Sequence, residues 1–546
     1  MSLLSIGMSG LNAAQGSLSV LSNNIANVNT PGYSRQQTTQ NANANNPYGG
    51  VFIGSGTTLA DVRRVYNEFL DQAYQNSTSL NNDAKAYSSQ ASAIDKTLSD
   101  KTTGMSSVLS AFFAAVQTSS ANPSDVSARQ VLLTSAQTLS NRFNSISNQL
   151  NQQKESINGQ LSTMSDQVNQ LTASIASLNK QITQVQGSSN SAPANLLDAR
   201  NEAVRSLNEL VGVTASEKNG VFSVSTGTGQ SLVLGDQSNT ISAVPSASDP
   251  SQYTIQLNAG GGTAIDLGNV LSGGSIGGLL RYRSDALMPA INDLGRIAIA
   301  TADTVNSQLG QGLDLNGDFG TSLFKDINSA AAIAQRSQGA AGNSVGSGNL
   351  NVSIKDSSKL STYDYKVTFT SGSNYTVMRS DGKAMGAFDT TTTPPPVIDG
   401  FTLALDGKGP VGAGDSFKVS PTANGATNIG TDLTDANKIA FAGPLLGEGS
   451  KTNQGTGTFT PPTLTLPIDI HGGADTAQLR TGIEHSMPVK MVFGKPAADG
   501  TQAYTLNDSQ GNPIGSGTIV PGQSNKITIN VPMRDANGAL VSPAKS

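Results

Sequence analysis

The sequence predicts a multidomain α + β protein: an elongated helical rod with coiled-coil-like long helices and a small β insertion, followed by two β-rich domains. Three observations predict this class. Apolar residues recur at helical spacing through most of the first 310 residues, short alternating runs punctuated by Gly, Ser, Thr and Pro follow, and 546 residues suffice for three or four domains. We expect an N-terminal helix and extended segment over 1–60, the helical rod over 61–324 with the β insertion near 214–275, a first β domain over 325–443, and a second over 444–546.

The N-terminal segment carries no charged side chain before Arg35. Its large apolar residues are separated by three, four or seven positions and therefore share one stripe of a helix. They are Leu4, Met8, Leu11, Leu18, Leu21, Ile25 and Val28. The helix should end before Pro31-Gly32, because a residue that precedes proline disfavours α geometry and glycine permits a turn.

An uncharged helix of this kind suits a surface that contacts copies of itself, because every charge would recur along a polymer and face its own kind. The alternative is a core helix of an ordinary domain. A secretory signal needs a basic start and a continuous apolar run, and a membrane-spanning helix needs about 20 mostly apolar residues. Neither pattern is present in the sequence.

Composition narrows the function classes. Charged residues make up only 13% of the chain, against about 25% in typical domains, and the net charge is -5. The chain therefore has no basic field for nucleic acid. It contains no cysteine, which excludes disulfides, thiol catalysis and thiolate metal sites.

The helical rod is predicted in several pieces. Residues 36–60 read as extended chain with one strand-like run at 51–53, and a helix should run from Asp61 to about Leu98. A shorter helix follows over 108–116. The longest helix should begin after Asn122-Pro123-Ser124-Asp125 and have about 60 residues, on the order of 90 Å. Its apolar seam consists of Leu139, Phe143, Ile146, Leu150, Ile157, Leu161, Met164, Val168, Leu171, Ile175, Leu178, Ile182 and Val185. A helix in a spectrin-like bundle is the alternative interpretation.

After a loop at 187–192, Pro193 should open a helix that reaches Leu210. Alternating runs over 211–272 predict the β insertion, and helical periodicity returns over 278–309. Beyond Phe324 the helical pattern nearly disappears. A weak repeat links 365–383 to 489–512, each copy reading as two strands, a glycine turn and further strands. We interpret this repeat as two β domains joined near Gly443-Pro444.

No constellation argues for catalysis, a cofactor or a metal ion. Asp314, Asn316 and Asp318 resemble the opening of a calcium loop, but Phe319 replaces the glycine at the sixth position and Lys325 replaces the glutamate at the twelfth. His471 and His485 lack the spacing of a zinc motif, and we expect them only to hydrogen-bond locally in turn-rich β sequence. We therefore predict a protein that is not an enzyme.

The run Leu21–Gln36, LSNNIANVNTPGYSRQ, resembles the N-terminal signature of bacterial flagellar axial proteins. Rod and hook proteins usually continue the Ser-Asn-Asn-Ile-Ala-Asn core as Thr-Thr-Gly-Phe, whereas the continuation here resembles the family of hook-associated protein 1. The positions that carry the resemblance are Asn24, Asn27, Thr30, Pro31, Gly32, Tyr33 and Arg35. Runs at 195–200, 314–317 and 414–419 also resemble that family.

The resemblance implies a structural adaptor at the hook–filament junction, exported by the flagellar type III pathway with an uncleaved N-terminal signal and located outside the cell. The implied partners are identical copies in a ring, the hook protein, the second junction protein and an export chaperone, with no nucleic acid and no membrane. The family ends in a heptad helix that pairs with the N-terminal helix. This chain ends in turn-rich sequence at 542–546, so we expect its second β domain to be truncated and the chaperone to bind the missing C-terminal region.

Two alternatives stay open from the sequence. The first is another flagellar axial subunit of the hook, rod or flagellin type, which the Pro31-Gly32-Tyr33 continuation disfavours. The second, from another class, is a secreted protein whose β domains bind or hydrolyse glycans. Such a protein should show a polar pocket with perturbed titrating groups, whereas an adaptor should show exposed apolar helix stripes.

Overall fold

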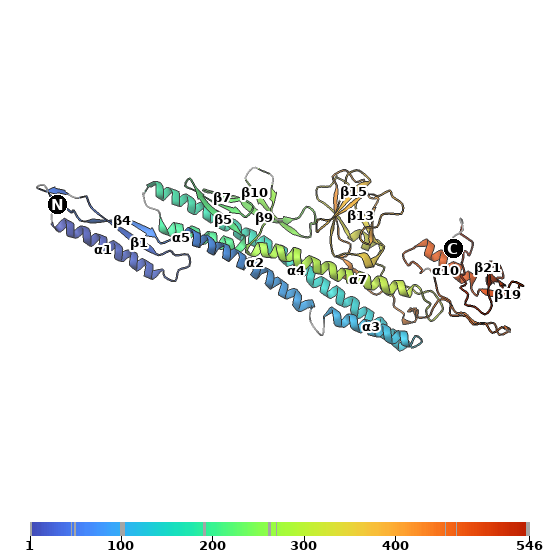
Figure 1. The fold of residues 1–546 in the computed structure, drawn as a ribbon. Helices are drawn as coiled ribbons and strands as arrows, with labels where there is room; N and C mark the ends of the chain where they lie inside the picture. The colour runs from blue at the N-terminus through green and yellow to red at the C-terminus, as the bar shows by residue number, and fades with distance from the viewer. Residues whose placement is uncertain are drawn as a thin grey trace. The chain divides into compact units, whose positions relative to one another are not determined.

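The structure, a computed structural model, describes residues 3–541 except 45, 49–50, 99–103, 189–192, 260–261, 263, 269, 454 and 466. The end of the predicted loop at 187–192 and the tail at 542–546 therefore lie outside the described residues. The chain divides into two compact units. Unit 1 comprises Met1–Thr97 and Gln149–Pro289, and unit 2 comprises Leu98–Asn148 and Ala290–Ser546. Long helices combined with several sheets confirm the predicted multidomain α + β class (Figure 1).

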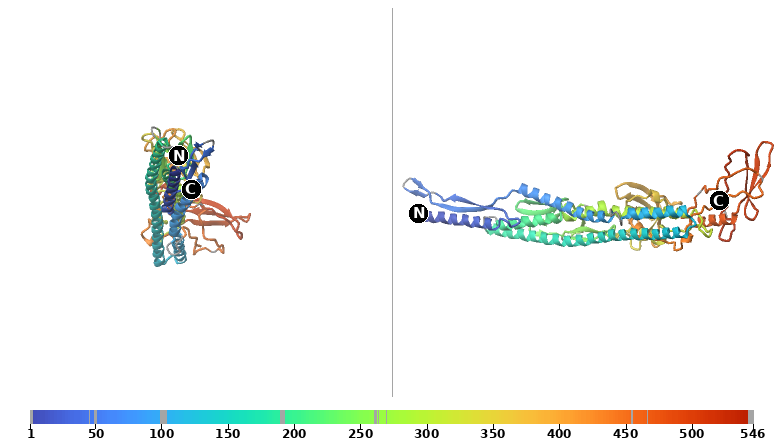
Figure 2. Two further views of the ribbon diagram at one scale, coloured as in Figure 1. Left: turned by 90° about the vertical axis from the view of Figure 1, so that its left-hand side faces the viewer. Right: turned by 90° about the horizontal axis from the view of Figure 1, so that it is seen from below.

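Unit 1 opens with helix α1 (Leu3–Ala26), which lies along an antiparallel hairpin of β1 (Gln36–Ala42) and β4 (Thr57–Arg64) (Figures 1 and 2). A small hairpin of β2 (Asn46–Tyr48) and β3 (Val51–Ile53) forms its tip. The segment predicted as extended chain is extended and is paired as a hairpin, and its predicted strand-like run at 51–53 is β3. One prediction is corrected here: Asp61–Arg64 belong to a strand rather than to a helix. The backbone amide and carbonyl groups of this segment hydrogen-bond to those of β1. Its charged residues therefore do not begin a helix.

Helix α2 (Glu68–Leu98) begins where Asn67 caps it, since the Asn67 side chain accepts a hydrogen bond from the Leu70 amide at 3.2 Å. The predicted longest helix is α4 (Val126–Ser188), with 63 residues. Asp125 caps its first turn by accepting from the Ser127 amide at 2.8 Å. The helix predicted after Pro193 is α5 (Ala194–Leu210). Both predictions are confirmed.

The β insertion of unit 1 forms two sheets. The first has the order β5-β6-β7-β8 and the second β11-β10-β9. Their strands are β5 (Val213–Lys218), β6 (Val221–Thr226), β7 (Ser231–Leu234), β8 (Gln237–Ser238), β9 (Thr240–Pro245), β10 (Tyr253–Asn258) and β11 (Ile265–Asp266). The side chains of Val224 and Val233 are fully buried, as the alternating pattern predicted.

The helix predicted over 278–309 is longer and interrupted. It consists of α6 (Gly274–Tyr282), a π-helical turn (Arg283–Leu287) and α7 (Met288–Leu309). Pro289 explains the interruption, because proline has no amide hydrogen and its ring clashes with the carbonyl four residues earlier.

Unit 2 contains α3 (Met105–Ala121), the first turns of α4, most of α7 and a five-stranded sheet of order β12-β18-β14-β15-β16. Two further strands, β13 and β17, pair with each other, and β19, β20 and β21 form a three-stranded sheet. The remaining elements are α8 (Ala330–Gln335), β12 (Ser337–Gly339), β13 (Leu350–Ile354), β14 (Tyr365–Phe369), β15 (Asn374–Arg379), β16 (Ala384–Asp389), β17 (Phe401–Leu405), β18 (Ser416–Val419), α9 (Gly425–Asn428), α10 (Ala474–Ser486), β19 (Lys490–Pro496), β20 (Gln502–Asn507) and β21 (Pro513–Ile519), with short 3₁₀ turns at Ser357–Lys359 and Ala436–Lys438.

The two copies of the predicted repeat are both antiparallel three-strand meanders, β14-β15-β16 and β19-β20-β21. The sequence missed α10 between them. Its apolar periodicity is weak, because only Gly482, Ile483 and Ser486 are buried in this helix of 13 residues. The domain boundaries proposed at 60, 324 and 443 stay predictions, and β4 continues across the first of them.

Candidate subunit-interface surface on the N-terminal helix

The predicted interface residues of α1 and its following turn all lie at the surface of unit 1. Their exposed fractions range from 53% at Leu21 to 74% at Leu4 and Val28. Gln15 and Ser22 interrupt the same side of the helix, and no charged residue lies on it. At about 100° per residue, the stripe lies opposite the face that packs within the chain. Unpartnered large apolar side chains gathered in one stripe are typical of an interaction surface.

The inward face of α1 is built from small residues. Ala13 is 3% exposed, and Ser9, Gly10, Gly16 and Ser17 are half-buried beside it. The Ser9 hydroxyl accepts a hydrogen bond from the Thr57 amide at 3.2 Å, and the hydroxyls of Ser17 and Thr38 are 3.2 Å apart. A Cβ on Gly16 would lie 3.0 Å from the Leu59 side chain. Small side chains thus let the helix approach β1 and β4 closely and leave the large ones outside.

The family-motif residue Asn24 ties the end of α1 to the start of β1. Its amide nitrogen donates to the Gln36 carbonyl at 2.9 Å, and its amide oxygen accepts from the Gln36 amide at 2.8 Å. The side chain therefore pairs with the backbone as a neighbouring strand would. The Tyr33 hydroxyl donates to the same amide oxygen at 2.8 Å. These contacts fix where the helix ends relative to the hairpin.

The Thr30–Tyr33 segment forms a tight turn. The Tyr33 amide donates to the Thr30 carbonyl at 3.2 Å, and Gly32 has a φ of +78°. A type II turn requires a positive φ at its third position, which glycine supplies, and favours proline at its second. The Asn27 amide group donates to the Asn23 carbonyl at 3.0 Å. The motif residues thus build the local structure. Arg35 is the exception: its side chain is exposed, and among the described residues only its carbonyl is engaged, by the Val65 amide at 2.8 Å.

Helix α5 holds this turn through a carboxylate whose role the sequence did not predict. Asp198 accepts from the Ser34 amide at 3.1 Å and forms an ion pair with Arg64 at 3.1 Å, with both side chains only 8% exposed. A Cβ on Gly32 would lie 2.9 Å from Glu202 Cβ. Asp198 lies in the 195–200 run that resembled the family. A lone acidic residue in a helical stretch gives no signal of a partner that lies 164 residues away in sequence.

A second apolar surface, on the first turns of α2, was also missed. Phe69, Leu70, Tyr74 and Leu80 are 75%, 62%, 58% and 69% exposed, whereas Gln75 on the opposite face is buried. Their separations of one, four and six positions do not repeat at three or four, so the sequence pattern did not indicate a shared face. Next to this surface, burial and a hydrogen bond to Asp71 raise the pKa of Tyr66 to about 12, so its phenol stays neutral.

The residues considered for metal binding have other partners. The Asp314 carboxylate accepts from the amides of Asn316 and Asp318 at 2.7 Å and 3.0 Å and closes a turn. Across the residues that the structure describes, no group of three or more His, Asp or Glu side chains could hold a metal ion. No helix in this described part of the chain is long and apolar enough to cross a membrane.

The prediction for the two histidines is wrong in part. His471 Nε2 lies 2.8 Å from Asp303 Oδ1 on α7, which is 168 residues away in sequence, so the contact is not local. That hydrogen bond raises the pKa of His471 against the opposing effect of burial. His485 lies in helix α10 rather than in β sequence, and its side chain is exposed.

Three family models match successive parts of the chain. Residues 4–33 match the family model of flagella basal body rod proteins, residues 91–324 match the helical domain of flagellar hook-associated protein FlgK, and residues 339–421 match the D2-like domain of flagellar hook-associated protein 1. An N-terminal helix of the rod-protein type, followed by such domains, defines a bacterial flagellar axial protein.

Individual relatives make the assignment narrower. The flagellar hook-associated protein 1 of Escherichia coli K12 is 33% identical over 504 residues, which are 88% of this chain and 89% of that protein. The Salmonella typhimurium protein is 34% identical over 451 residues, 81% of this chain and 79% of its own. The solved flagellar hook junction protein FlgK of Burkholderia pseudomallei matches with a TM-score of 0.67 and 29% identity, covering 86% of this chain and 83% of that one. The chain belongs to the flagellar hook-associated protein 1 family, and the resemblance drawn from its motif is confirmed.

Proposed function

We propose that this chain is a structural, non-enzymatic subunit of the junction between the flagellar hook and filament, and that the exposed stripe of α1 packs against copies of itself. Kinship with proteins named as hook-associated and hook junction proteins supports the junction role. The observation that carries the interface is the seven-residue stripe, at least 53% exposed and without a charge.

A ring of identical subunits explains both faces of α1. In a ring the contacts are head-to-tail, so the stripe of one copy meets a different surface of the next copy, and the same pair of surfaces is buried at every interface. The small inward face fixes the helix to its own hairpin, and the large outward residues are then available for burial between subunits. The surface of Phe69, Leu70, Tyr74 and Leu80 on α2 supports a second contact of the same kind.

The finer partner assignments belong to the same proposal. The hook protein on one side, the second hook–filament junction protein on the other, and an export chaperone before assembly would be the partners. The subunit would leave the cell through the type III pathway and reside in the extracellular flagellum. The absence of cysteine fits a chain that is unfolded during export and refolds outside without disulfides.

The experiment places a carboxylate on the stripe in the protein as cells produce it. Leu18→Asp or Ile25→Asp should abolish filament attachment, because burial of an unpaired carboxylate between subunits costs roughly several kcal/mol. Asn12→Asp is the matched control, since Asn12 is exposed on the same helix but lies beside the stripe. The readout is electron microscopy of cells that express each variant, with export and folding checked by secretion and circular dichroism.

The proposal predicts that both stripe variants are secreted and folded but leave cells without attached filaments, while Asn12→Asp cells keep them. Attached filaments on Leu18→Asp and Ile25→Asp cells would contradict the assignment of this face. Loss of filaments in the Asn12→Asp control as well would show that any charge on α1 blocks assembly, and the stripe would lose its special role.

A further inference from the structure

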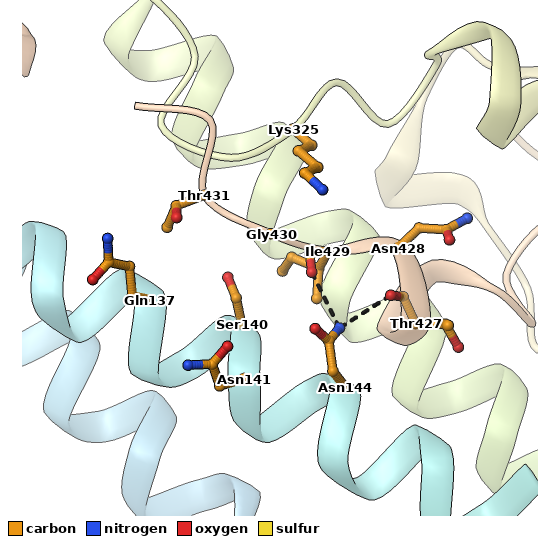
Figure 3. A pocket seen from close by; sticks show the side chains of 10 residues that line it. All are labelled: Gln137, Ser140, Asn141, Asn144, Lys325, Thr427, Asn428, Ile429, Gly430 and Thr431. Carbon is orange, nitrogen blue, oxygen red and sulfur yellow. Dashed lines mark hydrogen bonds between the residues drawn. The ribbon is translucent and has the colours of Figure 1, made fainter. Parts of the chain in front are cut away.

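A cavity of about 520 Å³ lies within unit 2. The residues that line it are mostly polar, unlike the apolar stripe of α1, and are distant from that stripe in sequence. Helix α4 forms one wall, the segment 427–431 forms the second, and Lys325 closes the third side (Figure 3). A volume between about 300 and 1,000 Å³ is typical of sites for small molecules. None of the residues that line the cavity is acidic, and Lys325 is the one charged residue among them.

The α4 wall is a polar face in a helix whose neighbouring face is fully buried and apolar. Gln137, Ser140, Asn141 and Asn144 follow the spacing of one helical face. Asn144 is already engaged, because its amide nitrogen donates to the carbonyls of Thr427 and Ile429, both at 3.1 Å. These bonds hold the 427–431 segment over the helix and so shape the cavity (Figure 3).

Ser140 has a buried hydroxyl without a partner. The residue is 3% exposed, and its Oγ makes no hydrogen bond in the described part of the chain. The other buried serines of α4 have partners: Ser165 donates to the Leu161 carbonyl at 2.8 Å, and the Ser147 hydroxyl lies 2.7 Å from that of Thr427. Figure 3 shows the Ser140 hydroxyl pointing from α4 toward the segment that carries Gly430. A buried hydroxyl left unsatisfied is costly, so this group is poised for a partner that enters from outside the chain.

Lys325 supplies the positive charge. Its side chain is exposed, and no carboxylate of the described residues lies within ion-pair distance of its ammonium group. A Cβ on Gly430 would lie 3.1 Å from Lys325 Cε, so the glycine gives the lysine stem room to lie against this segment. The side chains of Gln137 and Asn141 likewise make no hydrogen bond within the described ranges.

We propose that this cavity binds a small hydroxylated carboxylate of the size and chemistry of an acidic monosaccharide. Lys325 would receive the carboxylate, and Ser140, Gln137 and Asn141 would bind the hydroxyl groups. Amide and hydroxyl side chains both donate and accept hydrogen bonds, as sugar hydroxyls do, whereas an inorganic oxyanion only accepts. The amide oxygens favour a ligand with hydroxyl donors over a fully ionised inorganic anion, and the charge of the lysine favours a carboxylate over a neutral sugar.

The test is a calorimetric or NMR titration of the whole chain with sodium glucuronate, compared with glucose and with sodium sulfate at equal ionic strength. Glucuronate should bind saturably and more tightly than either comparator. Lys325→Gln should weaken binding at least about tenfold, equivalent to about 1.4 kcal/mol, and Ser140→Ala should weaken it measurably. Lys366→Gln and Ser165→Ala are the matched controls, because Lys366 is exposed outside the cavity and the Ser165 hydroxyl is bonded within its own helix.

Several results would overturn the proposal. Wild-type protein that shows no saturable binding of glucuronate would do so. So would binding that survives unchanged in both Lys325→Gln and Ser140→Ala, because the ligand would then lie elsewhere. Sulfate or glucose that binds as tightly as glucuronate would show that the cavity does not read a carboxylate and hydroxyl groups together.

Discussion

Helices α1 and α4 carry the same heptad spacing and use it in opposite ways. In α4 the seam residues Phe143, Ile157 and Leu161 are fully buried within their own units. In α1 the equivalent residues Leu18 and Ile25 are 61% and 66% exposed, and small residues make the contact inside the chain. Spacing thus determines which side chains share a face, but it does not determine what covers that face.

The two helices differ in a way that explains their opposite use. The exposed faces of α4 carry charged residues such as Glu155, Asp166 and Lys180, as a solvated helix does. Helix α1 has none. A helix that keeps charges on its outside has completed its packing within the chain, whereas one that lacks them and exposes leucines is suited to a further packing event.

The largest expected effect is on the free energy of unfolding, which should depend on the seam of α4 and not on the stripe of α1. Leu161→Ala should lower the free energy of unfolding of unit 1 by about 2–5 kcal/mol, because it leaves a cavity in a closed core. Leu18→Ala should change that free energy by no more than about 0.5 kcal/mol, because its side chain is mostly in solvent. Urea unfolding of the unassembled protein, followed by circular dichroism, measures both values. A comparable loss in the two variants would mean that the α1 stripe is covered within the monomer.

A smaller effect is expected at the turn that holds α1. Gly32→Ala should destabilise the hairpin region by about 1–3 kcal/mol, since φ is +78° there and the new Cβ would press on Glu202. Gly7→Ala is the control: no atom lies within 4 Å of its Cβ position, so alanine in mid-helix should stabilise by roughly 0.5–1 kcal/mol. Hydrogen exchange of residues 3–64 reports both. Equal protection in the two variants would show that the turn is not under this constraint.

The smallest effect concerns a contact made by charge rather than by apolar packing. The hydrogen bond to Asp303 raises the pKa of His471 above its ordinary 6.5, with Asp326 and Asp469 nearby reinforcing the shift. For Asp303, burial acts in the opposite direction, yet hydrogen bonds from His471 and Ser357 hold its pKa below 3.8. Because the folded state favours the charged histidine, its contribution is full below pH 6.5 and is lost as pH rises through the folded pKa.

The same contribution is lost on acidification, when Asp303 becomes protonated below its lowered pKa. The stability difference between wild type and His471→Gln should therefore be largest at about pH 5–6 and shrink as the pH rises above 6.5 and through the raised folded pKa of His471. Urea midpoints across this range give the curve, with His485→Gln as the exposed control. A difference that grows with pH would reverse the assigned sign.

Much of the fold followed from local rules. The 63 residues of α4, the start at Asp125 and the two three-strand meanders were predictable, because caps, heptads and alternation act over short distances. The hairpin of β1 and β4 was not, since polar strands with little apolar alternation give a weak signal and their pairing is non-local. Helix α10 was not predicted for a similar reason. Few of its side chains are buried, so its apolar periodicity is weak.

The candidate site divides in the same way. The stripe and the turn at Pro31-Gly32 came from spacing and from turn chemistry. The contacts that fix them did not, because Asp198 reaches the turn across 164 residues of sequence and Asn24 imitates a strand in a way that no spacing rule describes. The second apolar surface, on α2, has no regular spacing, and only the structure shows that these side chains face outward.

The central claim is that the α1 stripe is open in the single subunit and covered in the assembled flagellum. The chain contains no cysteine, so Leu18→Cys introduces a unique thiol. Its rate of reaction with a maleimide reports whether position 18 is exposed to solvent or covered by another subunit. Leu161→Cys provides the reference for a seam that is closed in both states. The account predicts rapid labelling of Leu18→Cys in the free subunit and strong protection in intact flagella, with Leu161→Cys protected throughout. Equal and rapid labelling of Leu18→Cys in free subunits and in intact flagella would contradict it.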